Sequence, residues 1–208
     1  VQQEGISSIL PIADREGFLV AHPNGIANAW NAGLCCGNAD VDDVAFLRTV
    51  VADIGGQARV DPRRVYATGL SNGGAMSQRL ACEAADLFAA AAPMAFPIPF
   101  RPLSTCAPSR PIPVMTGMGL TDVLVSYSGG AFPSAAETFA RWKEVNGCTG
   151  AAPDETVVTG LSRCETYSQC DAGVETQLCS ITADSFGGTL FDGHILYMRG
   201  ADVVSLDV

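Results

Sequence analysis

The amino-acid sequence predicts an α/β fold in which helices cover both faces of a mainly parallel sheet. Two observations support this prediction. Short apolar runs alternate along the chain with segments of helical periodicity, which is the order that parallel sheets require. The chain has 208 residues, of which 48% are hydrophobic and 16% charged, so it can bury a sizeable core. We therefore expect a single domain over residues 1–208.

The first half of the chain alternates helix and strand. The expected elements, in order, are a helix at Ile6–Arg15, a strand at Phe18–Ala21, a helix over 44–54, a strand at Val65–Thr68 and a helix at Gly74–Ala85. The strands are short apolar runs bounded by turn residues. In the helix over 44–54, apolar residues recur at helical spacing. Asp40 and Asp43 stand where an N-cap and its partner would stand, and Gly55-Gly56 is expected to end that helix.

The second half continues the pattern with more loops. The expected elements are a strand at Ala89–Ala95, a proline-rich loop at Pro97–Pro113, a strand at Pro113–Gly117, a helix from 134 to Asn146-Gly147, and strands at Val157-Val158 and Gln177–Thr182. Ser134 and Glu137 form a capping-box pattern that opens the helix. A cysteine-bearing loop is expected between the last two strands.

Charge and hydropathy exclude several classes of partner. Acidic residues outnumber basic residues 22 to 12, which gives a formal net charge of −10. A chain this acidic has no broad basic face for phosphate backbones or anionic lipid, so we expect neither nucleic-acid nor membrane binding. The longest apolar run, Leu87–Phe96, is too short to span a bilayer.

Eight cysteines indicate an oxidising compartment. No CxxC spacing occurs and the chain has two histidines, so we expect disulfides in a secreted or periplasmic protein and no metal site. The start at Val1, with no signal peptide ahead of it, fits a mature or trimmed product. The pairings expected are Cys164 with Cys170, Cys148 with Cys179, and one of Cys35 or Cys36 with Cys82 or Cys106.

The sequence Gly69-Leu70-Ser71-Asn72-Gly73 matches the G-x-S-x-G pattern of a nucleophile elbow. It follows an expected strand and opens an expected helix, as that turn requires. The glycines suit a strained backbone with no room for neighbouring side chains. A serine hydroxyl is a weak nucleophile and needs a base, so Ser71 requires a histidine partner.

The order nucleophile, acid, histidine selects His194 over His22. Asp122 is the preferred acid because it follows the strand at Pro113–Gly117, and active sites gather at the carboxyl ends of parallel strands. The acid would orient the imidazole. The other acids considered are Asp86, Asp154, Asp171, Asp184 and Asp192; Asp86 lies near a helix end and Asp192 is too close in sequence to the histidine.

Motifs along nearly the whole chain resemble one esterase group. They are Trp30-Asn31-Ala32-Gly33-Leu34-Cys35-Cys36-Gly37, Val41-Asp42-Asp43-Val44, Asp61-Pro62-Arg63-Arg64-Val65-Tyr66, Gly69–Gly74, Cys164-Glu165-Thr166-Tyr167, Cys170, Cys179 and Gly193-His194. Their combination resembles secreted esterases of the polyhydroxybutyrate depolymerase and feruloyl esterase group, in carbohydrate esterase family one of the α/β hydrolases.

This resemblance implies hydrolysis of carboxylic esters, of the polyester or feruloyl type, without a cofactor. The substrate would be an ester, including polymeric ones. Ser71 would be the nucleophile, Asp122 the acid and His194 the base, and the backbone N–H of Asn72 would donate to the oxyanion. The alternatives are a truncated, non-catalytic binding module with the same fold, and an acyltransferase that uses the same triad.

The sequence departs from this group at two places. Relatives carry earlier strands and a His-Gly loop that supplies a second oxyanion donor, and nothing like it precedes Ile6–Arg15, so we expect a shortened fold without the N-terminal strands. Such a fold would expose a sheet edge at Phe18–Ala21, through which two copies could pair as a homodimer. After His194, relatives often carry an aromatic-proline pair, whereas this chain continues Ile195-Leu196-Tyr197.

Aromatic residues near the predicted site are candidates for substrate binding. Trp30 precedes the cysteine pair in a loop, and packing is an equal alternative for it. Phe96 follows an expected strand, as Phe100 and Phe132 do, where a hydrophobic ester could meet them. Asp42-Asp43 resembles a metal pair, but helix capping accounts for these carboxylates better.

Overall fold

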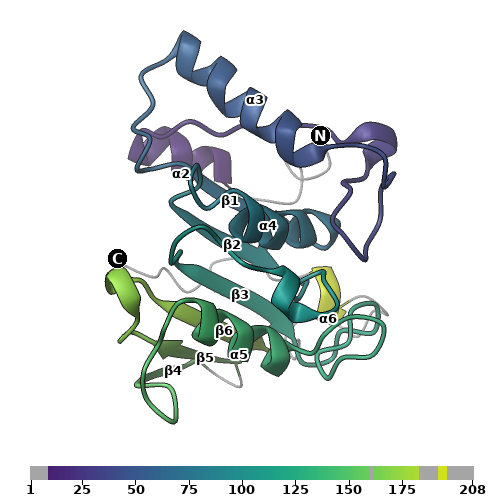
Figure 1. Ribbon diagram of the computed structural model, residues 1–208, viewed down its shortest axis with the longest axis vertical. Coiled ribbons are helices and arrows are strands. Elements are labelled where there is room, and N and C mark those ends of the chain that lie inside the picture. Colours follow the sequence, from purple (N-terminus) through teal and green to yellow (C-terminus); the bar gives the residue numbers. More distant parts are fainter. Residues whose placement is uncertain (1–8, 160–161, 183–191, 196–208) are drawn as a thin grey trace.

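The computed structural model describes residues 9–159, 162–182 and 192–195. Within this part of the chain, six strands form one sheet in the order β1-β2-β3-β6-β5-β4 (Figure 1). The strands are β1 (Tyr66–Leu70), β2 (Ala90–Met94), β3 (Val114–Gly119), β4 (Glu155–Thr159), β5 (Ser162–Tyr167) and β6 (Thr176–Ile181). Strands β1, β2, β3 and β6 are parallel, whereas β5 and β4 run antiparallel at one edge. The carboxyl ends of four strands therefore meet at one edge of the sheet.

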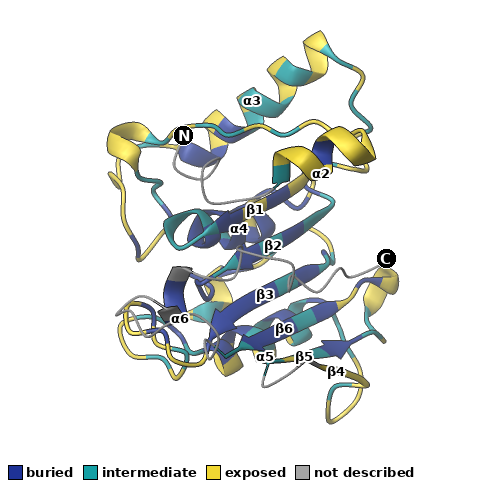
Figure 2. Ribbon diagram, turned by 180° about the vertical axis from the view of Figure 1, so that it is seen from behind, coloured by how far each residue is buried: buried dark blue, intermediate teal, exposed yellow. Residues whose placement is uncertain are grey.

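The described helices lie on one face of this sheet and at its edges. They are α2 (Ile9–Glu16), α3 (Asp43–Gln57), α4 (Asn72–Glu83), α5 (Ala135–Val145) and α6 (Asp192–Ile195), with 3-10 turns at Ile26–Asn28, Leu103–Thr105 and Asp171–Gly173. Helix α4 covers β1 and β2, α5 covers β6 and β3 on the same face, and α3 packs on α4 (Figure 1). Seen from behind, α2 lies beside the β1 end of the sheet (Figure 2). None of the helices in the described ranges has the length and apolar character needed to cross a bilayer.

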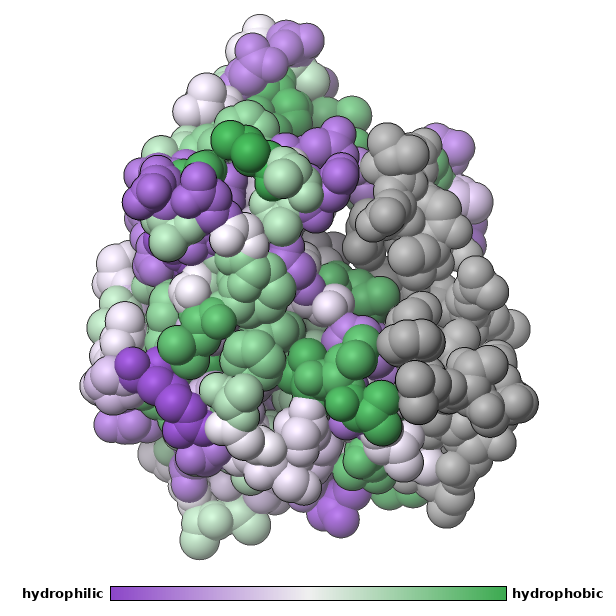
Figure 3. All heavy atoms as spheres, turned by 90° about the vertical axis from the view of Figure 1, so that its right-hand side faces the viewer, coloured by the Kyte–Doolittle hydropathy of each residue, from purple (hydrophilic) through white to green (hydrophobic). Residues whose placement is uncertain are grey.

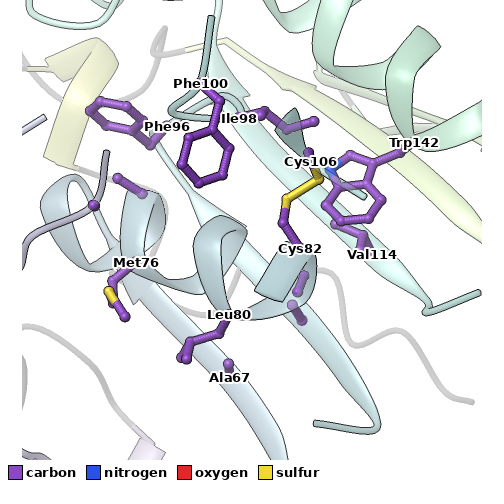
Figure 4. Close-up of a cluster of buried hydrophobic side chains, with 14 of the residues drawn as sticks. Ala67, Met76, Leu80, Cys82, Phe96, Ile98, Phe100, Cys106, Val114 and Trp142 are labelled. Carbon is purple, nitrogen blue, oxygen red and sulfur yellow. A yellow bond between two sulfur atoms is a disulfide. The ribbon is translucent and has the colours of Figure 1, made fainter. Parts of the chain in front are cut away.

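The core lies between α4, α5 and the sheet. Leu80 of α4 packs over Ala67 of β1, and Trp142 of α5 lies beside the Cys82–Cys106 disulfide (Figure 4). A fully buried hydrogen bond joins the two helices: the side-chain amide of Gln78 on α4 accepts it, at 2.8 Å, from the indole N–H of Trp142 on α5. Burying apolar surface at this junction stabilises the placement of α4, and so of the turn that precedes it.

The expected strand at Phe18–Ala21 is wrong: these residues form no strand. Phe18 and Leu19 are 44% and 66% exposed, and among the described residues the sheet ends at β1. A short apolar run becomes a strand only where a neighbouring strand pairs with its backbone. The exposed edge on which the homodimer was predicted is therefore not formed by Phe18–Ala21.

Other details of the expected elements also differ from the structure. Asp42, rather than Asp40, caps α3, because its carboxylate accepts a 3.0 Å hydrogen bond from the N–H of Ala45. The helix continues through Gly55-Gly56 to Gln57. The cysteine-bearing segment expected as a loop contains strand β5, which pairs with both β4 and β6.

All eight cysteines form disulfides, but the expected pairings are wrong. The bonds are Cys35–Cys36, Cys82–Cys106, Cys148–Cys170 and Cys164–Cys179. Cys164 stands directly opposite Cys179 in the β5–β6 register, so the hairpin decides its partner. For Cys164, strand register and not closeness in sequence therefore selects the partner.

Candidate active site

The serine of the G-x-S-x-G pattern occupies a strained turn between β1 and α4. Ser71 has φ 57° and ψ −119°, a conformation that side chains rarely adopt. Its N–H donates to the carbonyl of Met94, which ties the turn to the end of β2. A Cβ at position 69 would lie 2.5 Å from backbone atoms of Gly73, and a Cβ at position 74 would overlap the Met94 carbonyl. Gly69 is therefore required by space, as the elbow prediction implies, and so is Gly74, which directly follows the five-residue pattern, whereas a Cβ at Gly73 would meet no atom within 4 Å.

The structure brings together the three residues that the sequence singled out for catalysis. The Ser71 hydroxyl lies 2.7 Å from Nε2 of His194, and Nδ1 of the same ring lies 2.7 Å from Oδ2 of Asp122. Ser71 follows β1, Asp122 follows β3, and His194 lies on α6, which contacts β3. The three side chains thus meet at the carboxyl edge of the sheet, although Ser71 and His194 are 123 positions apart.

The second oxygen of Asp122 holds the carboxylate in place. Oδ1 accepts hydrogen bonds from the N–H groups of Leu124 and Val125, at 2.9 and 2.8 Å. The Asp122 side chain is completely buried, and that of His194 is 6% exposed. An ionised carboxylate can only accept, so Nδ1 of His194 carries the proton and Nε2 accepts from the Ser71 hydroxyl. In this tautomer, Nε2 faces the Ser71 hydroxyl as a hydrogen-bond acceptor.

The contact between α6 and the Asp122 loop depends on Gly193. A Cβ at this position would lie 2.6 Å from the carbonyl oxygen of Thr121 and would also overlap the N–H of Asp122. Gly193 therefore allows the His194-bearing turn to lie directly against the backbone of the acid loop. Sequence reasoning quoted Gly193 as part of a motif but missed this steric role; a glycine directly before the histidine was the available signal.

The two aromatic candidates for substrate binding lie in different surroundings. The Trp30 ring stacks on Phe46 at a centroid distance of 6.3 Å, while its backbone is hydrogen-bonded to the side chain of Asn72, next to the serine. Phe96 is 1% exposed and packs against Phe132 at 4.7 Å. The structure therefore places Phe96 in the hydrophobic core, because its neighbours cover it, and we remove it from the substrate-binding residues.

Apolar side chains are exposed beside the candidate site. Leu120, Val123 and Leu124, on the loop that carries Asp122, are 45%, 63% and 53% exposed. Figure 3 views the molecule from the side on which α6 lies, and hydrophobic surface is visible near the middle of that face. A hydrophobic part of a ligand could pack here without desolvating charged groups.

The described alternatives for the catalytic acid have other partners. Asp86 forms a two-pronged ion pair with Arg48, whose hydrogen bonds lower the pKa of that carboxyl. Asp154 accepts from the hydroxyl and the N–H of Ser168, and these bonds lower the Asp154 pKa. Asp171 begins the 3-10 turn at Asp171–Gly173. Asp184 lies outside the described residues.

The Asp42-Asp43 pair serves two structural purposes. Asp42 caps α3, and Asp43, which is 3% exposed, accepts a 2.6 Å hydrogen bond from the N–H of Asn31. In the ranges that the structure describes, no group of three or more His, Cys, Asp or Glu side chains is arranged to hold a metal ion. The capping prediction is thus confirmed for Asp42 but not for Asp43, whose partner comes from another loop.

Comparison with known proteins gives relatives that are esterases. No family model matches the chain. It is 38% identical over 196 residues to feruloyl esterase B of Piromyces equi, covering 86% of this chain and 36% of that protein. It is also 39% identical over 146 residues to NocK of Nocardia uniformis subsp. tsuyamanensis, which is described as a candidate esterase. This match covers 69% of this chain and 42% of NocK. These relatives confirm the feruloyl esterase part of the resemblance predicted from the motifs.

A solved structure agrees at the level of fold. Acetyl xylan esterase from Aspergillus awamori superimposes with a TM-score of 0.63 at 18% sequence identity, covering 86% of this chain and 76% of that one. The chain therefore has an α/β-hydrolase fold, as predicted. It spans only 36% and 42% of the length of the two curated relatives.

Proposed function

We propose that this chain carries the catalytic site of a serine esterase, with Ser71 as nucleophile, His194 as general base and Asp122 as the orienting acid. The observation that supports it most strongly is the continuous hydrogen-bonded series from the Ser71 hydroxyl through the His194 ring to the Asp122 carboxylate, with both distances at 2.7 Å. Nucleophile, base and orienting group in this relation are what acyl transfer to serine requires.

The chemistry follows from these atoms. Nε2 of His194 takes the hydroxyl proton as Ser71 Oγ attacks the ester carbonyl, and the resulting imidazolium is stabilised by Asp122. The tetrahedral intermediate collapses when His194 returns the proton to the departing alcohol, which leaves the acyl group on Ser71. Water then attacks the acyl-enzyme with its proton passing to Nε2, and the acid is released as the proton returns to Ser71.

The negative charge of the intermediate needs a fixed donor. Asn72 is the first residue of α4, where the helix offers no carbonyl for its N–H to bond. That N–H stands at the positive end of the helix dipole, directly after the nucleophile, and we assign it as an oxyanion donor. One such donor contributes on the order of 2.7–4 kcal/mol to transition-state stabilisation.

The relatives suggest the substrate class. Feruloyl esterase B and acetyl xylan esterase are named for esters whose acyl groups are an aromatic acid and acetate. The exposed aliphatic side chains on the Asp122 loop favour an ester with a hydrophobic acyl part, so we propose feruloyl-type esters, including polymer-bound ones. The eight paired cysteines support action outside the cell or in the periplasm.

A fluorophosphonate probe tests the nucleophile. We expect the intact mass of the purified protein to increase by one adduct, mapped to Ser71, and Ser71→Ala to lose the adduct and at least about 10⁴-fold of kcat on 4-nitrophenyl acetate. Ser77→Ala is the matched control. It removes a buried hydroxyl from α4, the helix that follows Ser71, and this hydroxyl donates a hydrogen bond to the Gly73 carbonyl. Wild-type rates in Ser71→Ala would refute the triad.

Two further results separate the alternatives. If the folded wild-type protein neither reacts with the probe nor hydrolyses any ester, the chain is a binding module with a hydrolase fold. Product analysis with an added acceptor alcohol distinguishes hydrolysis from acyl transfer: a new ester in place of free acid would identify an acyltransferase.

A further inference from the structure

Two consecutive loop residues next to the nucleophile have their whole backbone held by side chains. The N–H of Trp30 donates to Oδ1 of Asn72 at 2.7 Å, and the carbonyl of Trp30 accepts from Nδ2 of the same amide at 2.9 Å. The N–H of Asn31 donates to Asp43 at 2.6 Å, and the carbonyl of Asn31 accepts from Arg79 at 2.6 Å. We call Asp43, Asn72 and Arg79 the anchor residues.

A loop that only connects two elements does not need charged side chains to bind its backbone. Backbone groups in proteins bond mainly to other backbone groups or to water. Here an anionic and a cationic side chain are used instead, with Asp43 3% exposed and the Arg79 side chain 17% exposed. Hydrogen bonds to charged groups are stronger than neutral ones, and leaving one partner unpaired is expensive. The anchor residues therefore define the position of Trp30 and Asn31 closely.

The rest of the loop is held against the active-site edge of the sheet. A Cβ at Gly37 would lie 2.5 Å from the N–H nitrogen of Asn31, so the loop closes back on its own start. The N–H of Leu34 donates to the carbonyl of Pro99 at 2.9 Å, in the loop that follows β2. The Trp30–Gly37 loop therefore joins the turn after β1, which holds Ser71, to the loop after β2.

We propose that the Trp30–Gly37 loop is a rigid wall of the substrate site, and that Asp43 and Arg79 are positioning residues that set its selectivity between esters. This inference rests on the proposed esterase function and adds to it the residues that discriminate between substrates. Asn72 contributes twice, through its backbone N–H and through its side chain. Among the described residues, Asp43 and Arg79 hold the loop without bonding a triad residue, although Arg79 also pairs with Glu83 of its own helix at 3.0 Å, so their removal can be separated from effects on the triad.

The test measures selectivity in Asp43→Ala and Arg79→Met. Two ratios of kcat/KM are measured in each variant and compared with those of the wild type. The ratio of 4-nitrophenyl ferulate to 4-nitrophenyl acetate reports the preference for a large acyl group. The ratio of acetylated xylan to 4-nitrophenyl acetate reports the preference for a large alcohol. The intrinsic reactivity of each ester cancels in this comparison. We expect at least one ratio to fall about tenfold, mainly through KM, which corresponds to the loss of one charged hydrogen bond. Asp43→Asn and Arg79→Lys keep an acceptor and a donor, so they should restore most of the ratio.

Two controls separate selectivity from stability. Thr49→Ala lies on the exposed side of α3 and should leave both ratios unchanged. Acrylamide quenching of tryptophan fluorescence reports the position of the loop directly. Of the two tryptophans, Trp142 is only 1% exposed, so a change in quenching comes from Trp30, and quenching should rise in Arg79→Met.

Equal losses on all esters, or unchanged ratios in folded variants, overturn the inference. A wild-type protein without Ser71-dependent hydrolysis instead overturns the proposed function on which it rests.

Discussion

Replacing Gly193 with alanine tests whether the catalytic geometry depends on close backbone contact. Gly193 precedes His194 on α6, and its φ is not in the left-handed region, so alanine introduces no conformational strain of its own. The added Cβ, however, would lie 2.6 Å from the Thr121 carbonyl oxygen. Since Thr121 precedes Asp122, the substitution acts on the contact between base and acid.

The size of the effect follows from the closest approach of this Cβ. Ordinary van der Waals contact of a Cβ begins at 3.4 Å, and the nearest atom, the backbone nitrogen of Asp122, would lie at 2.4 Å, so α6 or the loop that carries Asp122 must move by about 1.0 Å. A shift of this size lengthens the 2.7 Å hydrogen bonds of His194 and misaligns its ring. Displacement of a catalytic group by about 1 Å costs roughly 10²-fold in rate, which is about 2.7 kcal/mol of transition-state stabilisation.

The assay is kcat/KM for 4-nitrophenyl acetate, with the thermal midpoint measured in parallel. Gly55→Ala is the control, because a Cβ there meets no atom within 4 Å and it lies inside α3, where alanine favours the helix. We expect Gly193→Ala to lose about 10²-fold and Gly55→Ala to keep its activity. A folded Gly193→Ala protein within twofold of the wild type would refute the reasoning.

Three further predictions use other contacts. In Asp122→Asn, the amide oxygen should keep the two backbone N–H donors that are now bound to Oδ1. The NH₂ group then faces His194 and places the ring proton on Nε2, so Nε2 can no longer accept the serine proton. We expect kcat to fall about 10³–10⁴-fold, and a loss below tenfold contradicts this. The double variant Cys82→Ser, Cys106→Ser opens a loop of sequence separation 24, so urea unfolding should show a free energy about 3 kcal/mol lower; a change below 1 kcal/mol contradicts this. Hydrogen bonds lower the carboxyl pKa of Asp86 and of Glu137. The contribution of these two carboxylates to stability is therefore complete above the ordinary carboxyl pKa and is lost as the pH falls through the lowered pKa values. The urea midpoint should decline below about pH 4, and a constant midpoint down to pH 2 contradicts this.

The features that the sequence predicted well are those that depend on neighbours along the chain. The elbow at Ser71 needs glycines at 69 and 74; the first belongs to the G-x-S-x-G pattern and the second directly follows it. The capping box at Ser134 involves residues three positions apart, and it forms as predicted. Asp122 could be selected because parallel strands present their carboxyl ends at one edge, which follows from strand order alone.

The features that the sequence could not predict depend on which distant segments become neighbours. Cys164 bonds Cys179 because β5 and β6 pair in one register, and a shift of one residue would turn the two side chains to opposite faces. Phe96 is buried because other segments cover it. Asp43 looks like a helix cap in sequence, yet its carboxylate is occupied by Asn31 from another loop.

The sequence by itself thus determined the strained turn at Ser71, the order β1-α4-β2-β3-α5 and the esterase resemblance, because such a turn and its glycines are encoded within six residues. The tertiary structure alone decided the hydrogen bonds of His194 to Ser71 and Asp122, the disulfide pairs and the anchoring of Trp30. The physical reason is that hydrogen bonds form over about 3 Å, while the chain that brings their partners together spans from 42 to 123 positions.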